Sequence, residues 1–251
     1  MPEAFAAALA LPHLPLLLAA TFAAGVVYGF AGFGAGLIFL PIATVLIDPA
    51  TAIAAFALSA LSSLVTLVPR AWGECDRRET VYMALAATLT LPVGIWVLRT
   101  VDPRTTQFAV SGLAALTLLV LIAGVRLSVR PGIRASVGVA GLAGVLGGAT
   151  GLLGPAVILF NLAAGGGAAR MRANTLVFLT LGSLLVVPQM ALQGLITGHA
   201  LWLGAMLLPA YAAGGLAGRA LFDPRREALY RAVAYALIAV AIALGLRGAA
   251  G

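Results

Sequence analysis

A series of apolar stretches, each about as long as a bilayer is thick, limits the folds that this chain can adopt. A helix needs about 20 apolar residues to cross the hydrocarbon core, and such stretches follow one another from residue 12 to residue 246. Only 9% of the residues are charged, against roughly 25% in soluble globular proteins. Because this chain cannot cover a water-exposed surface with polar groups, we predict an all-α, polytopic transmembrane helical bundle.

Ten apolar segments are separated by Pro, Gly, Asp or Arg residues, which are typical of helix ends. The segments of the first half are 12–30, 33–47, 50–69, 80–98 and 105–125. Those of the second half are 136–149, 152–165, 173–193, 199–218 and 228–246. In each half the first two segments meet at a Gly-rich break, GFAGFGAG at 29–36 and GGATGLLGP at 147–155.

The arginines indicate how the chain crosses the membrane. If every segment crosses or turns back, the loops on one face carry Arg70, Arg77, Arg78, Arg126, Arg130, Arg134, Arg170, Arg172, Arg219, Arg225, Arg226 and Arg231. The other face then carries only Arg99, Arg104 and Arg247. If each Gly-broken pair is instead one long crossing, the arginines divide almost equally between the faces. Because Arg-rich loops stay in the cytoplasm, we expect the chain to turn back at each break, with both termini on the outer face.

The two halves of the chain resemble each other, which predicts an internal duplication. GVVYGFAGFGAG, which starts at Gly25, aligns with GVLGGATGLLGP, which starts at Gly144. The sequence Asp-Pro-Arg also occurs in both halves, at residues 102–104 and 223–225, before the last apolar segment of each. Both alignments have nearly the same offset, as expected for two copies of one ancestral unit.

Five segments in each half place the second copy upside down relative to the first, the plan of many secondary transporters. We therefore predict two inverted repeats of five segments, residues 1–126 and 127–251, within one integral membrane domain. The Gly-broken pairs then hang from opposite faces, either spanning fully or forming re-entrant hairpins. Non-helical backbone at membrane depth must be buried in protein or line a water-filled cavity. The sequence thus predicts that the two tips meet near the midplane, where bare N–H groups and helix N-termini suit an anion.

Candidate substrate-binding residues lie at the two tips and on the segments beside them. Those at the tips are Gly32, Phe33, Gly34, Gly36, Gly151 and Gly154. Those on the neighbouring segments are Ser59, Ser63, Asn161, Asn174 and Thr175. Hydroxyl and amide groups are costly in hydrocarbon unless they are paired, so we expect them to face the bundle interior and bind an oxyanion.

Several functions are disfavoured by what the membrane segments lack. The eight acidic residues all lie in or beside loops, which argues against a carboxylate-based proton relay or sodium site. Without a P-loop, a nucleophile–base pair or a metal-ligand cluster, we expect no enzyme, no cofactor and no bound metal. The net charge of +7 comes from arginines spread over short loops, which indicates membrane topology rather than nucleic-acid binding. The sequence leaves open whether two copies form a homodimer.

The motifs GFAGFGAGLIFLPIA and GVLGGATGLLGPAVILF, together with the two Asp-Pro-Arg segments, resemble those of the sulfite exporter TauE/SafE family. The resemblance covers nearly the whole chain and implies a permease of the bacterial inner membrane for sulfite, an organosulfonate or a related small anion. We predict a secondary-type transporter that works by alternating access at the midplane. Export is expected because an anion leaving a cell that is negative inside gains about 2.3 kcal/mol per charge per 100 mV. A permease for a carboxylate or a metal cation, and a membrane scaffold without transport function, remain the alternatives.

Overall fold

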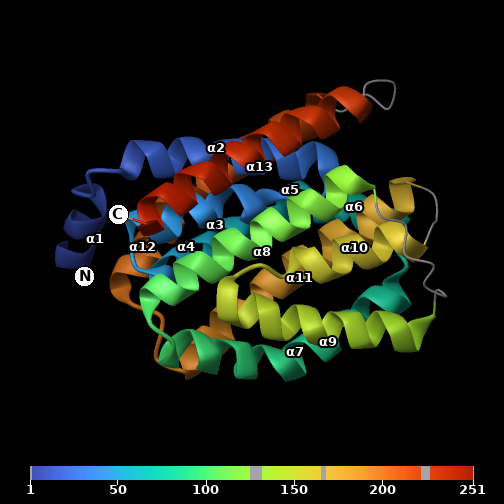
Figure 1. Cartoon of the computed structure of the whole chain (residues 1–251), viewed down its shortest axis with the longest axis horizontal. Coiled ribbons are helices and arrows are strands. Elements are labelled where there is room, and N and C mark those ends of the chain that lie inside the picture. Colours follow the sequence, from blue (N-terminus) through green and yellow to red (C-terminus); the bar gives the residue numbers. More distant parts are fainter. Residues whose placement is uncertain (1, 125–131, 165–167, 222–226, 251) are drawn as a thin grey trace.

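The computed structural model describes residues 2–124, 132–164, 168–221 and 227–250, which form helices joined by short turns and contain no strand. Most of the long helices run side by side along one direction of the molecule (Figure 1). The helices are α1 (Pro2–Leu9), α2 (Leu14–Ala31), α3 (Ala35–Leu46), α4 (Pro49–Ala60), α5 (Ser63–Thr66), α6 (Val68–Glu74), α7 (Arg77–Thr100), α8 (Pro103–Ala123), α9 (Ile133–Thr150), α10 (Gly154–Ala164), α11 (Ala168–Leu192), α12 (Gly198–Leu221) and α13 (Glu227–Ala250). The predicted all-α membrane bundle is confirmed.

Helix length separates the ten predicted segments into two kinds. Among the described residues, eight helices are long and apolar enough to cross a membrane, counting α4 and α5 as one span from Pro49 to Thr66. The segments that follow the Gly-rich breaks are shorter, with 12 residues in α3 and 11 in α10. At 1.5 Å per residue these helices measure only about 18 Å and about 17 Å, against a hydrocarbon core of about 30 Å. Neither helix is therefore long enough to cross the hydrocarbon core by itself.

The third predicted segment, 50–69, is divided into α4, α5 and α6 in the structure. The amides of Leu61 and Ser62 donate to carbonyls three residues earlier, at 3.2 Å each, which tightens the backbone and ends α4. Ser59 and Ser62 also donate their hydroxyls to carbonyls three residues earlier, a bond that bends helices. Apolar composition alone did not predict this division, nor the short helices α1 and α6.

Aspartates begin three of the helices. The Asp48 carboxylate accepts the Thr51 amide at 2.9 Å, and that of Asp76 accepts the Glu79 amide at 3.0 Å. The Asp102 carboxylate accepts the Arg104 amide at 2.8 Å. Such caps satisfy amides at the helix start that have no partner within the helix. The first Asp-Pro-Arg motif is thus a helix start, while its counterpart at 223–225 lies outside the described residues.

The chain turns back at the first Gly-rich break. Gly25 and Gly29 of α2 lie against Gly215 and Arg219 of α12, so these two helices run in the same direction. In α3, Pro41 lies against Gly245 of α13 and Val45 against Gly248, so α3 runs parallel to α13. Since α1 and the C-terminal end of α13 lie at the same end of the molecule (Figure 1), α2 leads away from that end and α3 returns to it.

The second break makes a corresponding turn. Gly144 and Gly148 of α9 pack on Ala87 and Leu91 of α7, so α9 and α7 are also parallel. After the break, Leu153 folds back against Gly147 of α9 as α10 begins. In both cases the helix before a Gly-rich break packs in parallel on a long helix of the other half of the chain.

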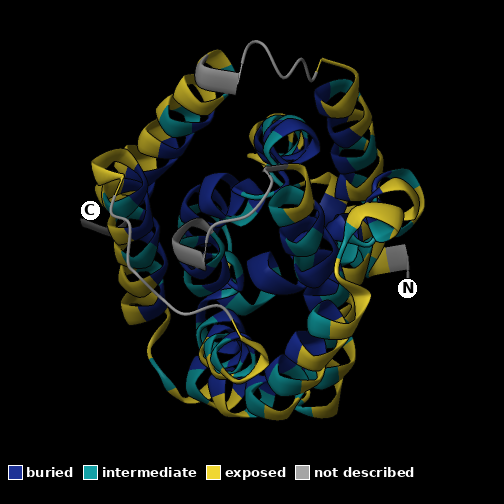
Figure 2. Ribbon diagram, turned by 90° about the vertical axis from the view of Figure 1, so that its right-hand side faces the viewer, coloured by how far each residue is buried: buried dark blue, intermediate teal, exposed yellow. Residues whose placement is uncertain are grey.

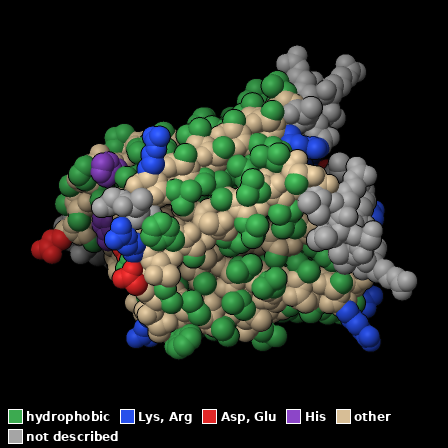
Figure 3. All heavy atoms as spheres, viewed as in Figure 1, with side chains coloured by type: hydrophobic (Ala, Val, Ile, Leu, Met, Phe, Trp, Pro, Cys, Tyr) green, Lys and Arg blue, Asp and Glu red, His purple; other side chains and the backbone are tan. Residues whose placement is uncertain are grey.

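An apolar surface surrounds the bundle between two charged ends. Hydrophobic side chains cover its flank in Figure 3, and the charged side chains visible there lie towards the two ends. On α7 the exposed side chains of Leu85, Leu89, Val93 and Trp96 form one such stripe. Viewed along the bundle, exposed residues lie mainly on the outer surfaces of the helices, and buried residues are concentrated inside (Figure 2). This distribution suits a protein whose sides face lipid and whose ends face water.

Candidate functional site

Both Gly-rich breaks contain backbone in the left-handed region. After α2 the chain passes through Gly32, with φ of 78°, and Gly34, with φ of 92°, before α3 begins. After α9, Gly151 has φ of 75°, and α10 begins three residues later. Residues with a Cβ rarely adopt these angles, which explains the glycines at these three positions.

The two breaks line one cavity of about 50 Å³. Residues 34–37 contribute from the first break and residues 151–155 from the second. The tips are close, because a Cβ placed on Gly36 would lie 3.2 Å from Cδ2 of Leu152. A space of this size holds more than one water molecule, so it has room for a small solute.

The N-terminus of α3 lies on the wall of this cavity. Its first amide with an intrahelical partner is that of Ile38, which donates to the Gly34 carbonyl at 3.2 Å. Helix geometry leaves the three preceding amides, at 35–37, without such partners, and the residue at the N-cap, Gly34, has no side chain to satisfy them. The first residues of α10, Gly154 and Pro155, face the same space. Positive ends of two helices therefore meet at one cavity.

Two tyrosines and a phenylalanine form another wall. The ring centroids of Tyr28 and Tyr211 are 5.9 Å apart, and those of Phe56 and Tyr211 are 6.0 Å apart. The Tyr28 hydroxyl donates to the Leu176 carbonyl at 2.8 Å and lies 2.9 Å from the Thr180 hydroxyl. Tyr211 is 2% exposed and carries its hydroxyl at the cavity.

Four of the predicted site residues line the cavity, namely Gly34, Gly36, Gly151 and Gly154. Gly32 lies beside the break, where a Cβ would be 2.7 Å from Cγ of Arg172. Phe33 is half-buried between the two left-handed glycines.

The predicted serines lie in the wall behind the cavity. The Ser59 hydroxyl donates to the Phe56 carbonyl at 2.8 Å, so it is satisfied within α4. The Ser63 side chain is 1% exposed and faces the Tyr211 hydroxyl. The two hydroxyls lie outside hydrogen-bond geometry, and Ser63 Oγ has no hydrogen-bond partner among the described residues.

The predicted amides and Thr175 join helices to one another. Asn161 Nδ2 donates to the Thr175 hydroxyl at 2.7 Å, which links α10 to α11. Asn174 Oδ1 accepts the Asp76 amide at 2.7 Å, which links α11 to the start of α7. Among the described lining residues none of these three appears. Their polar groups thus have partners in protein, as polar groups at membrane depth require.

Four further residues line the cavity that were not predicted as site residues: Tyr28, Phe56, Ser183 and Tyr211. Aromatic residues within apolar helices usually pack in the core, so their spacing carried no signal. Tyr28 precedes Gly32 by one helical turn, which is the only sequence feature that relates it to a tip. Tyr211 lies far from both tips in sequence and reaches the cavity because α12 packs on α2.

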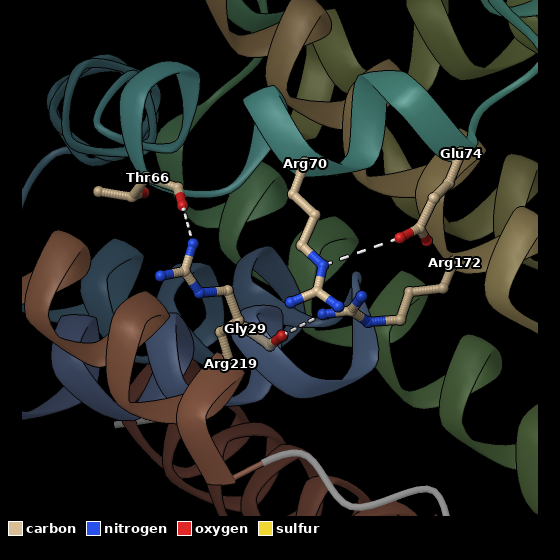
Figure 4. A network of polar contacts seen from close by, with 6 residues as sticks. All are labelled: Gly29, Thr66, Arg70, Glu74, Arg172 and Arg219. Atoms are coloured by element: carbon tan, nitrogen blue, oxygen red, sulfur yellow. Dashed lines mark hydrogen bonds and ion pairs between the residues drawn. The ribbon is translucent and has the colours of Figure 1, made fainter.

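Two arginines, Arg172 and Arg219, donate to carbonyls of neighbouring helix ends (Figure 4). The Arg172 guanidinium donates to the carbonyl of Phe30 at 2.8 Å and to that of Gly29, two of the last four carbonyls of α2. Arg219 donates to the Thr66 carbonyl at 2.8 Å, at the end of α5. Cations at these positions complement the negative ends of the helices.

A family model described as sulfite exporter TauE/SafE matches residues 17–244. The match extends from α2 to α13 and includes both Gly-rich breaks. No curated protein and no solved structure matches the chain.

Proposed function

Because the chain belongs to the sulfite exporter TauE/SafE family of membrane transporters, we propose that it carries a small anion through the cavity between the two tips. Sulfite, an organosulfonate or a related sulfur oxyanion is the substrate class that the family name suggests. Transport follows alternating access, in which the cavity opens to each side of the membrane in turn.

The observation that carries this proposal is the convergence of both Gly-rich breaks on one cavity. Residues 34–37 and 151–155 are separated by more than a hundred positions, yet they line the same space. The breaks bring two helix N-termini to that space, where main-chain amides and helix dipoles favour a negative ligand. Non-helical backbone at membrane depth is tolerated where it is buried in protein or lines a water-filled cavity, and here both breaks line one cavity.

Motion during transport involves helices from both halves of the sequence. Backbone of α2 packs directly on backbone of α12, and backbone of α9 on that of α7. Each of these pairs joins one helix of residues 1–126 to one of residues 127–251, the proposed inverted repeats. A rocking motion therefore carries each tip together with a helix of the other half.

The proposed direction is export. With the Arg-rich end in the cytoplasm, α1 and the C-terminal end of α13 lie on the outer face of the membrane. An anion moving outward then descends the membrane potential, so it needs no coupled ion. A carboxylate fits the same site chemistry and remains the second candidate. A cation is disfavoured because the described lining has no carboxylate.

Flux in proteoliposomes under an imposed potential tests the proposal. The flux of sulfite, sulfoacetate and a plain carboxylate is compared for the wild type and for Gly32→Leu. In this variant leucine would have to adopt a left-handed φ, and its side chain would collide with that of Arg172. We expect saturable flux of the sulfur anions in the wild type and its loss in the variant. Gly112→Leu is the matched control, because a Cβ on Gly112 meets no atom within 4 Å. Normal flux in folded Gly32→Leu protein contradicts the proposed site.

A further inference from the structure

The cavity has no charged side chain in its described lining. Its polar side chains are Tyr28, Ser183 and Tyr211, and the others are apolar or glycine. Arg172 lies outside the described lining, and its guanidinium donates to carbonyls near the end of α2. A ligand in this space therefore contacts main-chain amides, hydroxyls and hydrocarbon.

The positive potential at the cavity comes from the ends of helices. A helix N-terminus carries a partial charge of about +0.5, so α3 and α10 together offer about one unit. The Arg172 guanidinium donates to the carbonyls of Gly29 and Phe30 near the end of α2, so a full positive charge offsets the negative end of that helix.

This potential matches one negative charge and not two. The positive ends of α3 and α10 together compensate the charge of a monoanion. A dianion would keep about one negative charge without a counter-ion in a largely apolar space. Burial of an uncompensated charge is strongly unfavourable. The electrostatics of the lining therefore separate anions by charge even where their shapes agree.

Tyr211 supplies a specific donor for such an anion. Its hydroxyl is at the cavity, its residue is 2% exposed, and no protein acceptor for it occurs among the described hydrogen bonds. The Ser63 hydroxyl behind it is also buried, and it has no hydrogen-bond partner within the described part of the chain. Buried hydroxyls are normally paired, so the unpaired Ser63 hydroxyl next to Tyr211 indicates a hydrogen-bond chain that a ligand in the cavity completes. Tyr28 differs, because its hydroxyl already donates to Leu176.

We propose that the cavity binds a singly charged oxyanion, one oxygen of which accepts a hydrogen bond from the Tyr211 hydroxyl. Ser63 is the positioning residue: when the ligand is bound, its hydroxyl donates to the Tyr211 oxygen and so orients the Tyr211 proton towards the anion. The inference rests on the proposed function and adds the charge class of the substrate and the side chain that recognises it.

Methanesulfonate and sulfate test the charge class, because both are tetrahedral and similar in size but carry one and two negative charges. Each is added as a competitor to radiolabelled sulfite flux in wild-type proteoliposomes, at constant pH and ionic strength. We expect methanesulfonate to inhibit at a concentration at least tenfold lower than sulfate. Equal or stronger inhibition by sulfate overturns the charge assignment.

Tyr211→Phe tests the donor, since it removes one oxygen and keeps the aromatic wall. We expect the KM for sulfite and the inhibition constant for methanesulfonate to rise about tenfold or more, the usual effect of losing a hydrogen bond to a charged group. Tyr82→Phe, on the exposed side of α7, should leave both constants unchanged. An unchanged KM in Tyr211→Phe overturns the assignment of the donor.

Ser63→Ala completes the test and also serves if Tyr211→Phe does not fold. Because Ser63 acts through Tyr211, its removal should raise the KM several-fold in the wild type and have no further effect in Tyr211→Phe. If Ser63→Ala raises the KM by the same factor in the wild type and in Tyr211→Phe, the positioning role is contradicted.

A binding measurement separates this inference from the proposed function. If wild-type protein shows no flux of sulfite, sulfoacetate or a plain carboxylate, the proposed function fails. Methanesulfonate, with sulfate as comparison, is then tested for its effect on the melting temperature of the purified wild type and Tyr211→Phe. If methanesulfonate but not sulfate raises the melting temperature of the wild type, and this rise is absent in Tyr211→Phe, the proposed binding site stands. If methanesulfonate does not raise the melting temperature of the wild type, the proposed binding site is refuted.

Discussion

Two glycines at the first tip, Gly34 and Gly36, give a matched pair of methyl additions with different expected effects. Gly34 has φ of 92°, whereas Gly36 lies within α3. Alanine at Gly34 must adopt the left-handed region, which costs roughly 1–2 kcal/mol. Its Cβ would also lie 3.2 Å from Cγ1 of Val27. We expect Gly34→Ala to be destabilised by about 1–2 kcal/mol, or roughly 2–8 °C in melting temperature.

Alanine at Gly36 needs no unusual backbone. Helix propensity favours alanine over glycine by about 1 kcal/mol, and the nearest atoms are the ends of the Leu152 and Phe56 side chains, at 3.2 Å and 3.6 Å. These can move by a few tenths of an ångström, so we expect stability within about 1 kcal/mol of wild type. The added methyl group nevertheless enters the cavity beside the bare amides of α3, so transport should fall.

Thermal unfolding in detergent, followed by tryptophan fluorescence, measures the stability of both variants, and proteoliposome flux measures their activity. The expected pattern is a lower melting temperature for Gly34→Ala, and a near-normal melting temperature with reduced flux for Gly36→Ala. Equal stability of the two variants refutes the argument from backbone conformation. Normal flux in Gly36→Ala refutes the assignment of the cavity to the transport path.

Three further predictions concern packing, a helix end and sidedness. Gly148→Ala should lose about 1–3 kcal/mol in thermal unfolding, because its Cβ meets only backbone of α7 and the helices must separate; Gly112→Ala, in open space, should not be destabilised. Arg172→Gln should lose about 1.5–3 kcal/mol in the same assay as charged hydrogen bonds to α2 disappear; an unchanged melting temperature contradicts this. Burial raises the pKa of the Cys75 thiol, an effect partly offset by the positive charge of Arg77. Less thiolate is then present at neutral pH, so alkylation should be slow there and accelerate above pH 9; an impermeant maleimide should label inside-out vesicles and not intact cells if the Arg-rich end is cytoplasmic.

Much of the site was visible in the sequence because glycine has a specific backbone meaning. Gly34 and Gly151 were predicted at the tips, and each adopts a left-handed φ at the cavity. Side chains on helices were less predictable. Asn174 and Asn161 had the chemistry of anion ligands, but the structure pairs them with Asp76 and Thr175. Which neighbour satisfies an amide depends on helix packing, which the sequence does not display.

The sequence by itself determined that the chain is a helical membrane protein, where most of its helices begin and end, and where two of them break. These properties follow from local physics: the length of apolar runs, the capping of helices by aspartate and the backbone freedom of glycine. The tertiary structure was needed to show that the two breaks share one cavity and that Tyr211 lines it, with Ser63 behind Tyr211. Those relations join residues distant along the chain, and they depend on how closely α2 packs on α12 and α9 on α7. Contacts of that kind are set by the shapes of whole helix surfaces and have no counterpart in a local sequence pattern.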